Sequence, residues 1–303
     1  MIFLAFLLFA CLASTFHMGA QVVKVSDSFF FVGFRMILAG LLMLSYLFFF
    51  NKKYFKIQRK DLWLFVQFTL SLIFLSYNLE FLGMRYLNPS KACLFFSMTP
   101  FITVIFERFI FSTKITFKKF IGLVIGILGY APLVMAKTVG AESTVAHVAF
   151  FSWPELIMLG SVVCYSYGWI VMKELSQVKQ YSPILINGVG MFSGGVATMV
   201  MALSQPLFFN VGPLVTNWPL FLTFTLLMIF VANIIGYNLY GYLLRFYSAT
   251  FMSLLGFVAP LFSALIGYTL GTEVLTWHFF VSAITVFIGL IIFHQDELVE
   301  VTN

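Results

Sequence analysis

Residues 28–50 read SFFFVGFRMILAGLLMLSYLFFF, and Arg35 is the one charged residue among them. A helix needs about 20 mostly apolar residues to cross the hydrocarbon core of a bilayer. Five basic residues follow this run directly: Lys52, Lys53, Lys56, Arg59 and Lys60. An apolar run of this length that ends in a basic loop predicts a transmembrane helix followed by a cytoplasmic loop.

The same apolar composition extends over the whole chain. Of its 303 residues, 61% are hydrophobic and 9% are charged, whereas soluble domains carry about 25% charged residues. So few charges cannot cover a water-facing surface, and we expect an all-α integral membrane protein with no soluble domain. The basic residues behind the net charge of +6 lie in short loops. This placement follows the positive-inside rule and excludes a nucleic-acid partner.

Charged clusters and turn residues divide the chain into ten predicted transmembrane helices. They cover residues 2–23, 28–50, 62–84, 90–111, 117–137, 154–173, 183–203, 219–243, 248–271 and 275–293. Residues 138–152 form a polar loop of small residues and are the best candidate for a linker between two halves. Residues 2–23 lack the basic start of a signal peptide, so they count as the first helix.

The orientation follows from the Lys and Arg residues in the loops. With a cytoplasmic N-terminus, the inner loops hold 11 of them and the outer loops hold 4. The inner residues are Lys52, Lys53, Lys56, Arg59, Lys60, Lys114, Lys118, Lys119, Lys173, Lys179 and Arg245; the outer ones are Lys24, Arg85, Lys91 and Lys137. This bias predicts that both termini are cytoplasmic and that the protein lies in the cell (inner) membrane if it is bacterial.

No cofactor and no metal site is predicted. Cys11, Cys93 and Cys164 lie in apolar segments without metal-ligand spacing, and we interpret them as small packing residues. The sequence also lacks the GxxxxGK[ST] pattern of an ATP-binding loop. Any transport would therefore draw its energy from a gradient or from exchange.

An internal repeat appears when the chain is shifted by 160 residues. The triplet Tyr77-Asn78-Leu79 then meets Tyr237-Asn238-Leu239; the other matches are Arg85 with Arg245, Pro100 with Pro260, Thr116 with Thr276, and Gly129 with Gly289. The predicted domains are therefore a first five-helix repeat at 1–140 and a second at 141–303. Because five is odd, the second repeat enters the membrane from the opposite side, as in many alternating-access transporters.

Several motifs resemble the ten-helix EamA-type branch of the drug/metabolite transporter superfamily. They are residues 34–40 (FRMILAG), the stretch from 83 through 90–92 (SKA) to Pro100, the glycine-rich residues 122–129, and residues 249–260. A glutamate typical of this family is present as Glu273, but Thr113 stands at the equivalent first-half position. The resemblance implies a central cavity lined by the first, third, fourth, sixth, eighth and ninth predicted helices.

Glu80 is the most informative polar residue inside a predicted helix, because charges within a bilayer are costly and usually functional. Tyr77 lies one turn before Glu80 on the same face, and Asn78 follows Tyr77 in the sequence. Glu80 is either a cation or proton site or a structural partner of Arg35, Arg85 or Lys91. Arg35 itself is interpreted as structural, with substrate binding as the alternative.

The first predicted helix carries a polar stripe. Ser14, His17, Gln21 and Lys24 follow one another at helical spacing. The stripe is expected to turn inward, where it lines a cavity or forms hydrogen bonds between helices.

Polar aromatic residues mark two further helices. The eighth helix carries Asn233, Tyr237 and Tyr240, which α-helical spacing places on one face, and the sixth carries Tyr165 and Trp169. Such side chains both stack and donate hydrogen bonds. We interpret them, with Glu80, Tyr77, Asn78, Ser14, His17 and Gln21, as candidate substrate-binding residues.

Paired prolines and glycine motifs complete the pattern. Pro100 and Pro260 are placed in the middle of their helices and are interpreted as hinges or local breaks, with a tolerated kink as the alternative. The glycine pairs 122/126, 190/194 and 267/271 permit close packing of helices. Packing within the chain and formation of a homodimer are both open.

These features favour a secondary active transporter that moves a small polar organic metabolite by alternating access. An aromatic cavity with one carboxylate suits a cationic or zwitterionic solute. S-adenosylmethionine, which some relatives in the superfamily carry, is the leading substrate, for uptake or exchange. The alternatives are an amino-acid or other metabolite or drug exporter of the same superfamily, a membrane channel, and an intramembrane enzyme. GxSG, HExxH and GxGD motifs are absent from the sequence, which disfavours the enzyme.

Overall fold

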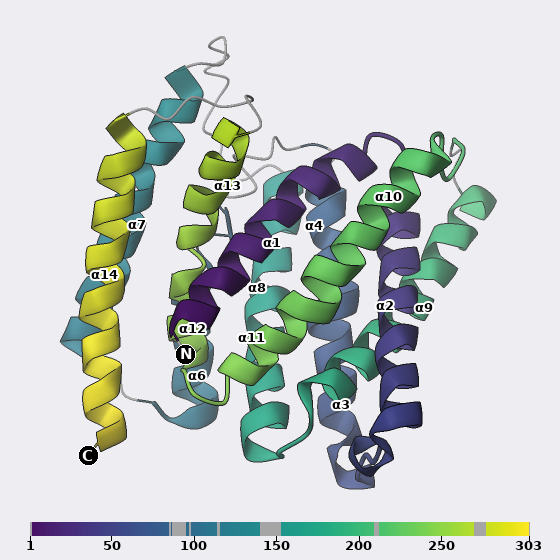
Figure 1. Ribbon diagram of the computed structural model, residues 1–303, viewed down its shortest axis with the longest axis horizontal. Helices are drawn as coiled ribbons and strands as arrows, with labels where there is room; N and C mark the ends of the chain where they lie inside the picture. Colours follow the sequence, from purple (N-terminus) through teal and green to yellow (C-terminus); the bar gives the residue numbers. More distant parts are fainter. Residues whose placement is uncertain are drawn as a thin grey trace.

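The computed structural model describes residues 2–84, 86, 95–96, 98–113, 116–139, 153–208, 212–269 and 277–302. In these ranges the regular structure is helical, apart from one antiparallel bridge between Ser26 and Val215. The helices stand side by side, with their connections at the upper and lower ends in Figure 1. This is the all-α arrangement that the composition predicts.

The first half supplies two long helices, a three-part helical rod and two further helices. They are α1 (Ile2–Val22), α2 (Ser28–Phe50), the rod of α3 (Leu62–Phe68), η3 (Thr69–Ser76) and α4 (Tyr77–Met84), then α6 (Thr99–Phe111) and α7 (Phe117–Val139). Two short 3₁₀ turns, η1 (Lys52–Tyr54) and η2 (Arg59–Asp61), lie in the basic loop between α2 and α3.

The second half has a corresponding set of helices. They are α8 (Trp153–Lys173) with η4 (Glu174–Val178), α9 (Pro183–Phe208), the rod of α10 (Trp218–Met228), η5 (Ile229–Gly236) and α11 (Tyr237–Leu243), then α12 (Ala249–Leu255), α13 (Val258–Thr269) and α14 (Trp277–Thr302). Five helical stretches of the described chain are long and apolar enough to cross a membrane. The start of the predicted helix at 90–111 and most of the linker at 138–152 lie outside the described residues.

Two π-helices occupy matching positions in the two halves. Both η3 and η5 have eight residues, and adding 160 to the bounds of η3 gives those of η5 (69 + 160 = 229; 76 + 160 = 236). Each is followed at once by a Tyr-Asn-Leu triplet. π-helices are rare and are often found at functional sites. Their equivalent placement therefore supports the 160-residue repeat with a feature of the backbone.

Two helix pairs pack at close range, α2 with α9 and α7 with α14 (Figure 1). A Cβ atom added to Gly40 would lie 2.7 Å from the Cα atom of Phe192 on α9. On the other pair, a Cβ atom at Gly289 would lie 2.8 Å from the carbonyl oxygen of Gly122. The glycines at 122, 190 and 194 all contact other helices of the same chain. The pairs 122/126 and 190/194 therefore serve packing within the chain, whereas Gly271 of the third pair lies outside the described residues.

The two prolines lie in the first turns of helical segments, so their placement in the middle of continuous helices is wrong. Pro100 is the second residue of α6 and Pro260 is the third residue of α13. The first four N–H groups of a helix have no acceptor within it, so proline removes no hydrogen bond there. The ninth predicted helix is divided into α12 and α13 by a turn at Gly256 and Phe257.

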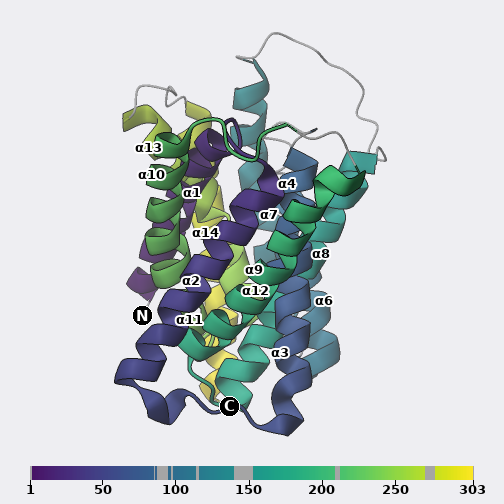
Figure 2. The ribbon, with the colours of Figure 1, turned by 90° about the vertical axis from the view of Figure 1, so that its right-hand side faces the viewer.

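Hydrogen bonds tie the loops together at each end of the bundle. At one end, the Asp27 N–H donates to the Leu214 carbonyl at 2.9 Å. At the other end, the Tyr181 hydroxyl donates to Asp61 Oδ2 at 2.7 Å, and Arg245 donates to the Tyr181 carbonyl at 2.8 Å. The loops that the charge count places on the inner side therefore meet one another. Both chain ends lie towards the lower side in Figures 1 and 2.

We expect Gly40→Ala to lower the free energy of unfolding by about 1–3 kcal/mol, because the new methyl group meets the backbone of α9. The matched control is Gly160→Ala, whose Cβ would have only Leu79 Cδ1 nearby, at 3.6 Å. Thermal unfolding of the purified protein in detergent measures both. Equal midpoints for the two variants would contradict the close α2–α9 contact.

Candidate functional site

Four buried aromatic side chains from three helices form the centre of the candidate site. The rings of Trp169 on α8 and Tyr240 on α11 are stacked, with centroids 3.7 Å apart. Tyr237 lies 5.3 Å from Trp169 and 6.3 Å from Tyr77 on α4, measured between ring centroids. We call Tyr77, Trp169, Tyr237 and Tyr240 the aromatic cluster. It joins the first half of the chain to the second.

Tyr165 extends the aromatic cluster along α8. Its ring lies edge-on to Trp169, with centroids 5.9 Å apart, and also edge-on to Phe96 at 5.5 Å. Phe9 on α1 packs edge-on against Tyr240 at 6.2 Å. The structure therefore brings together five of the residues that the sequence analysis selected, from helices far apart in the chain.

Arg35 on α2 borders the aromatic cluster. Its side chain is buried, and its guanidinium carbon lies 5.0 Å from the ring centre of Phe31 and 5.3 Å from that of Tyr77. Contacts of this kind are cation–π interactions. The sequence interpretation of Arg35 as structural gave no sign of the contact with Tyr77, because the two residues lie on different helices.

Glu80 lies one turn after Tyr77 on α4 and is partly accessible. It interacts electrostatically with Arg35. Within the described ranges, however, neither side chain forms an ion pair or a hydrogen bond, and Arg35 Nε is buried without a partner. An ion pair between Glu80 and Arg35 is therefore not formed. The other two partners considered, Arg85 and Lys91, lie outside the described residues.

The two selected asparagines point to other helices. Asn78 Nδ2 donates to Thr198 Oγ1 on α9 at 2.9 Å. Asn233 Nδ2 lies 3.3 Å from Met36 Sδ and 3.5 Å from Met191 Sδ. Asn233 belongs to the π-helix η5, whereas Tyr237 is the first residue of α11. Their position on one face of the rod stays a prediction.

The polar stripe on α1 stays apart from the aromatic cluster where its side chains are described. The Ser14 hydroxyl donates to the Cys11 carbonyl of its own helix at 2.7 Å, and Gln21 is exposed. The inward turn of the stripe stays a prediction, because exposure alone does not distinguish a cavity wall from a lipid-facing side. The His17 side chain lies outside the described part.

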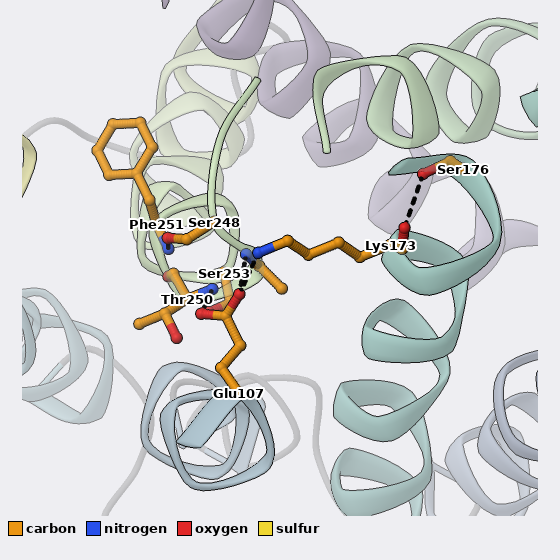
Figure 3. Close-up of polar contacts among 8 residues, drawn as sticks. Glu107, Lys173, Ser176, Ser248, Thr250, Phe251 and Ser253 are labelled. Atoms are coloured by element: carbon orange, nitrogen blue, oxygen red, sulfur yellow. Dashed lines mark hydrogen bonds and ion pairs between the residues drawn. The ribbon is translucent and has the colours of Figure 1, made fainter. Parts of the chain in front are cut away.

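A second polar site, which the sequence analysis missed, is centred on Glu107 of α6 (Figure 3). Lys173 Nζ at the end of α8 lies 2.7 Å from Glu107 Oε1. The backbone N–H groups of Ala249 and Thr250, at the start of α12, donate to Glu107 Oε1 and Oε2 at 2.8 and 3.0 Å. The carboxylate therefore joins three helices and caps one of them, as a negative charge at a helix N-terminus does.

The burial of Lys119 and Lys173 changes the charge count, because both side chains have partners inside the bundle. Without these two, the inner total falls from 11 to 9, against 4 outside, so the predicted orientation is unchanged. The sequence contained one signal for this site. Glu107 is a carboxylate inside the apolar run 99–111, and a charge in such a run usually has a function or a partner.

The sequence pattern of the EamA-like transporter family matches residues 1–135 and 152–294, which together cover most of the chain. The chain belongs to the EamA-like transporter family. It is therefore an integral membrane protein of a transporter family, with a small molecule as the expected cargo. The two matched segments correspond to the two sets of helices described above.

Curated relatives agree with this assignment, and a solved structure has the same fold. The S-adenosylmethionine/S-adenosylhomocysteine transporter of Chlamydia muridarum is 30% identical over 89% of this chain and 83% of its own length. That of Chlamydia trachomatis serovar D is 30% identical over 89% and 81%. A protein of known crystal structure, 16% identical, has a TM-score of 0.73 and covers 96% of this EamA-like chain and 93% of its own. It shares the fold.

We expect Glu107→Leu to lower the free energy of unfolding by about 3–5 kcal/mol, because it leaves a buried ammonium group and two backbone donors unpaired. The control is Glu174→Gln, which removes a pair with Lys179 at 4.0 Å near the surface and should cost at most about 1 kcal/mol. Thermal unfolding in detergent separates them. A loss no larger than that of the control would show that Glu107 does not hold the helices together.

Proposed function

We propose that this protein is a secondary active transporter that carries S-adenosylmethionine across the membrane by alternating access, in uptake or exchange. The observation that carries the proposal is the aromatic cluster, which lies where the two halves of the chain meet. The names of the relatives from Chlamydia muridarum and Chlamydia trachomatis support the choice of cargo.

The chemistry of the aromatic cluster suits this cargo. S-adenosylmethionine combines a flat adenine base with a sulfonium cation. Aromatic faces stack on a base, and they attract a cation through the negative charge of the ring face. Tyrosine and tryptophan also donate hydrogen bonds from their edges, which phenylalanine cannot do. One surface of this kind can hold both parts of the cargo.

The rings pack against one another in this conformation, so the cargo reaches them only when α4, α8 and α11 separate. The π-helices η3 and η5 end directly before Tyr77 and Tyr237, and the break at Gly256 and Phe257 divides α12 from α13. We infer that these interruptions, with Pro100 and Pro260 beside the starts of α6 and α13, are the hinges of the transport cycle.

The same proposal includes ten spans in two inverted halves, residues 1–140 and 141–303. Both termini are then cytoplasmic, in the inner membrane if the source is bacterial, and the protein moves its cargo without chemical change. The matching π-helices, the meeting of the basic loops at one end and the corrected charge count of 9 against 4 support this arrangement.

We expect proteoliposomes with the wild-type protein to take up radiolabelled S-adenosylmethionine with saturation and counterflow. Trp169→Ala should lower this uptake by about tenfold or more, since base–aromatic stacking is worth about 1–3 kcal/mol per base. Trp169→Phe keeps a stacking face and should retain most of the uptake.

The matched control for this experiment is Trp63→Ala, because Trp63 on α3 is 66% exposed. Wild-type uptake that does not saturate would indicate a channel. Counterflow with amino acids or other metabolites, but not with S-adenosylmethionine, would favour another cargo of the same family. An equal loss of uptake in the Trp63 and Trp169 variants would show that the aromatic cluster is not part of the binding site.

The topology is tested with single cysteines in a background that lacks Cys11, Cys93 and Cys164. A membrane-impermeant thiol reagent added to whole cells should label Gly212→Cys and should not label Lys53→Cys or Lys179→Cys. All three positions are exposed in the structure. Opening the cells should make the last two reactive. Labelling of Lys53→Cys in intact cells would reverse the proposed orientation.

A further inference from the structure

Arg35 on α2 lies over the ring of Tyr77, one turn before Glu80 on α4, and within the described residues the two opposite charges form no ion pair. We propose that they form a binding site for an α-amino-acid head group, in which Arg35 binds the carboxylate and Glu80 binds the ammonium group. The inference rests on the proposed function and names the part of the cargo that this end of the site recognises.

The described contacts of Arg35 and Glu80 differ from those of a structural ion pair. Placing charges in an apolar interior is costly unless they are paired and hydrogen-bonded. Glu107 meets that requirement, since its carboxylate accepts from Lys173 at 2.7 Å and from two backbone N–H groups. In the described part of the chain, Arg35 and Glu80 have no such partners, and Arg35 Nε is buried and unpaired. A ligand with the complementary charges supplies the missing bonds.

Ring contacts hold the Arg35 side chain in place. The Arg35 guanidinium lies against the faces of Phe31 and Tyr77, and Phe31 is held edge-on by Phe81, the residue after Glu80, with centroids 5.4 Å apart. A guanidinium held on two rings still presents its N–H donors at its edge. This is the geometry in which arginine binds a carboxylate through two parallel hydrogen bonds.

A zwitterionic head group fits between the two side chains better than a simple ion does. In an α-amino acid, the carboxylate and the ammonium group are attached to the same carbon atom, so both charges are satisfied in one small volume. A lone cation would leave Arg35 unpaired, and a lone anion would leave Glu80 unpaired. Burying either charge without a partner is unfavourable. The pair therefore selects for cargo that carries both groups.

The position of the charges also sets the direction of the cargo. Tyr77 contacts both Arg35 and Tyr237, Tyr237 contacts Trp169, and Trp169 stacks on Tyr240. The head group then lies at the Arg35–Glu80 end, and an aromatic base lies towards Trp169. A sulfonium between the two ends would face Tyr77 and Tyr237.

The test compares ligands and variants in pairs. Binding of S-adenosylmethionine is measured on the full-length protein in nanodiscs, together with the decarboxylated form and with the analogue whose α-amino group is replaced by hydroxyl. For the wild-type protein, each analogue should bind about 10- to 100-fold more weakly, because each loses a hydrogen bond between charged groups. A site built to bind a polar group rejects ligands that lack it.

Each variant should lose one preference and keep the other. Arg35→Gln should bind S-adenosylmethionine and its decarboxylated form almost equally, and should still reject the hydroxyl analogue. Glu80→Gln should show the opposite pattern. Arg35→Lys keeps the charge without the planar fork and should keep part of the preference for the carboxylate. Gel filtration and the melting midpoint establish that each variant is folded.

The matched controls are Arg108→Gln and Glu174→Gln. Arg108 is exposed and donates to the Thr113 carbonyl at 3.1 Å, and Glu174 lies near the surface. Both controls should keep wild-type preferences.

If Arg35→Gln weakens all three ligands by the same factor, the head-group site is wrong while the proposed function stands. If the wild-type protein does not bind S-adenosylmethionine, the proposed cargo is wrong. In that case, binding of methionine and of methioninamide is measured for the wild-type protein and for each variant. A preference for methionine that Arg35→Gln abolishes supports the head-group site, and the absence of such a preference overturns it.

Discussion

A charge buried in an apolar bundle must be paired, and this requirement governs how the helices are held together at Glu107. The carboxylate binds Lys173 on α8 and the first N–H groups of α12, so three helices from both halves of the chain meet at one group. The pair supplies a fixed connection in a molecule whose remaining helix contacts are mostly apolar. Transport by the proposed cycle requires movement around such fixed points.

The same requirement gives the opposite result at Arg35 and Glu80. The two charges form no ion pair within the described part of the chain, and the Arg35 guanidinium lies over two aromatic rings. The molecule thus contains one satisfied pair that holds helices and one separated pair beside the aromatic cluster. Pairing inside the protein favours stability, whereas charges left without partners favour binding of a ligand that brings its own.

The aromatic cluster shows which residues of the candidate site could be predicted from the sequence. Tyr77, Tyr165, Trp169, Tyr237 and Tyr240 were selected because polar aromatic side chains inside apolar helices are informative, and the structure brings them together. Asn78 and Asn233 were selected by the same reasoning but contact other helices. The difference arises from the neighbouring helix that each side chain meets, which the pattern along one helix does not give.

The sequence by itself determined that the chain lies in a membrane, where most helices begin and end, and that a pattern recurs after 160 residues. These properties follow from the length of apolar runs, from loop charges and from matched residues, which are all local or periodic features. Only the tertiary structure decided which polar groups are paired. Glu107 and Lys173 lie on different helices, and so do Arg35 and Tyr77. Such contacts depend on how helices are rotated and packed against one another, which no pattern along a single helix records.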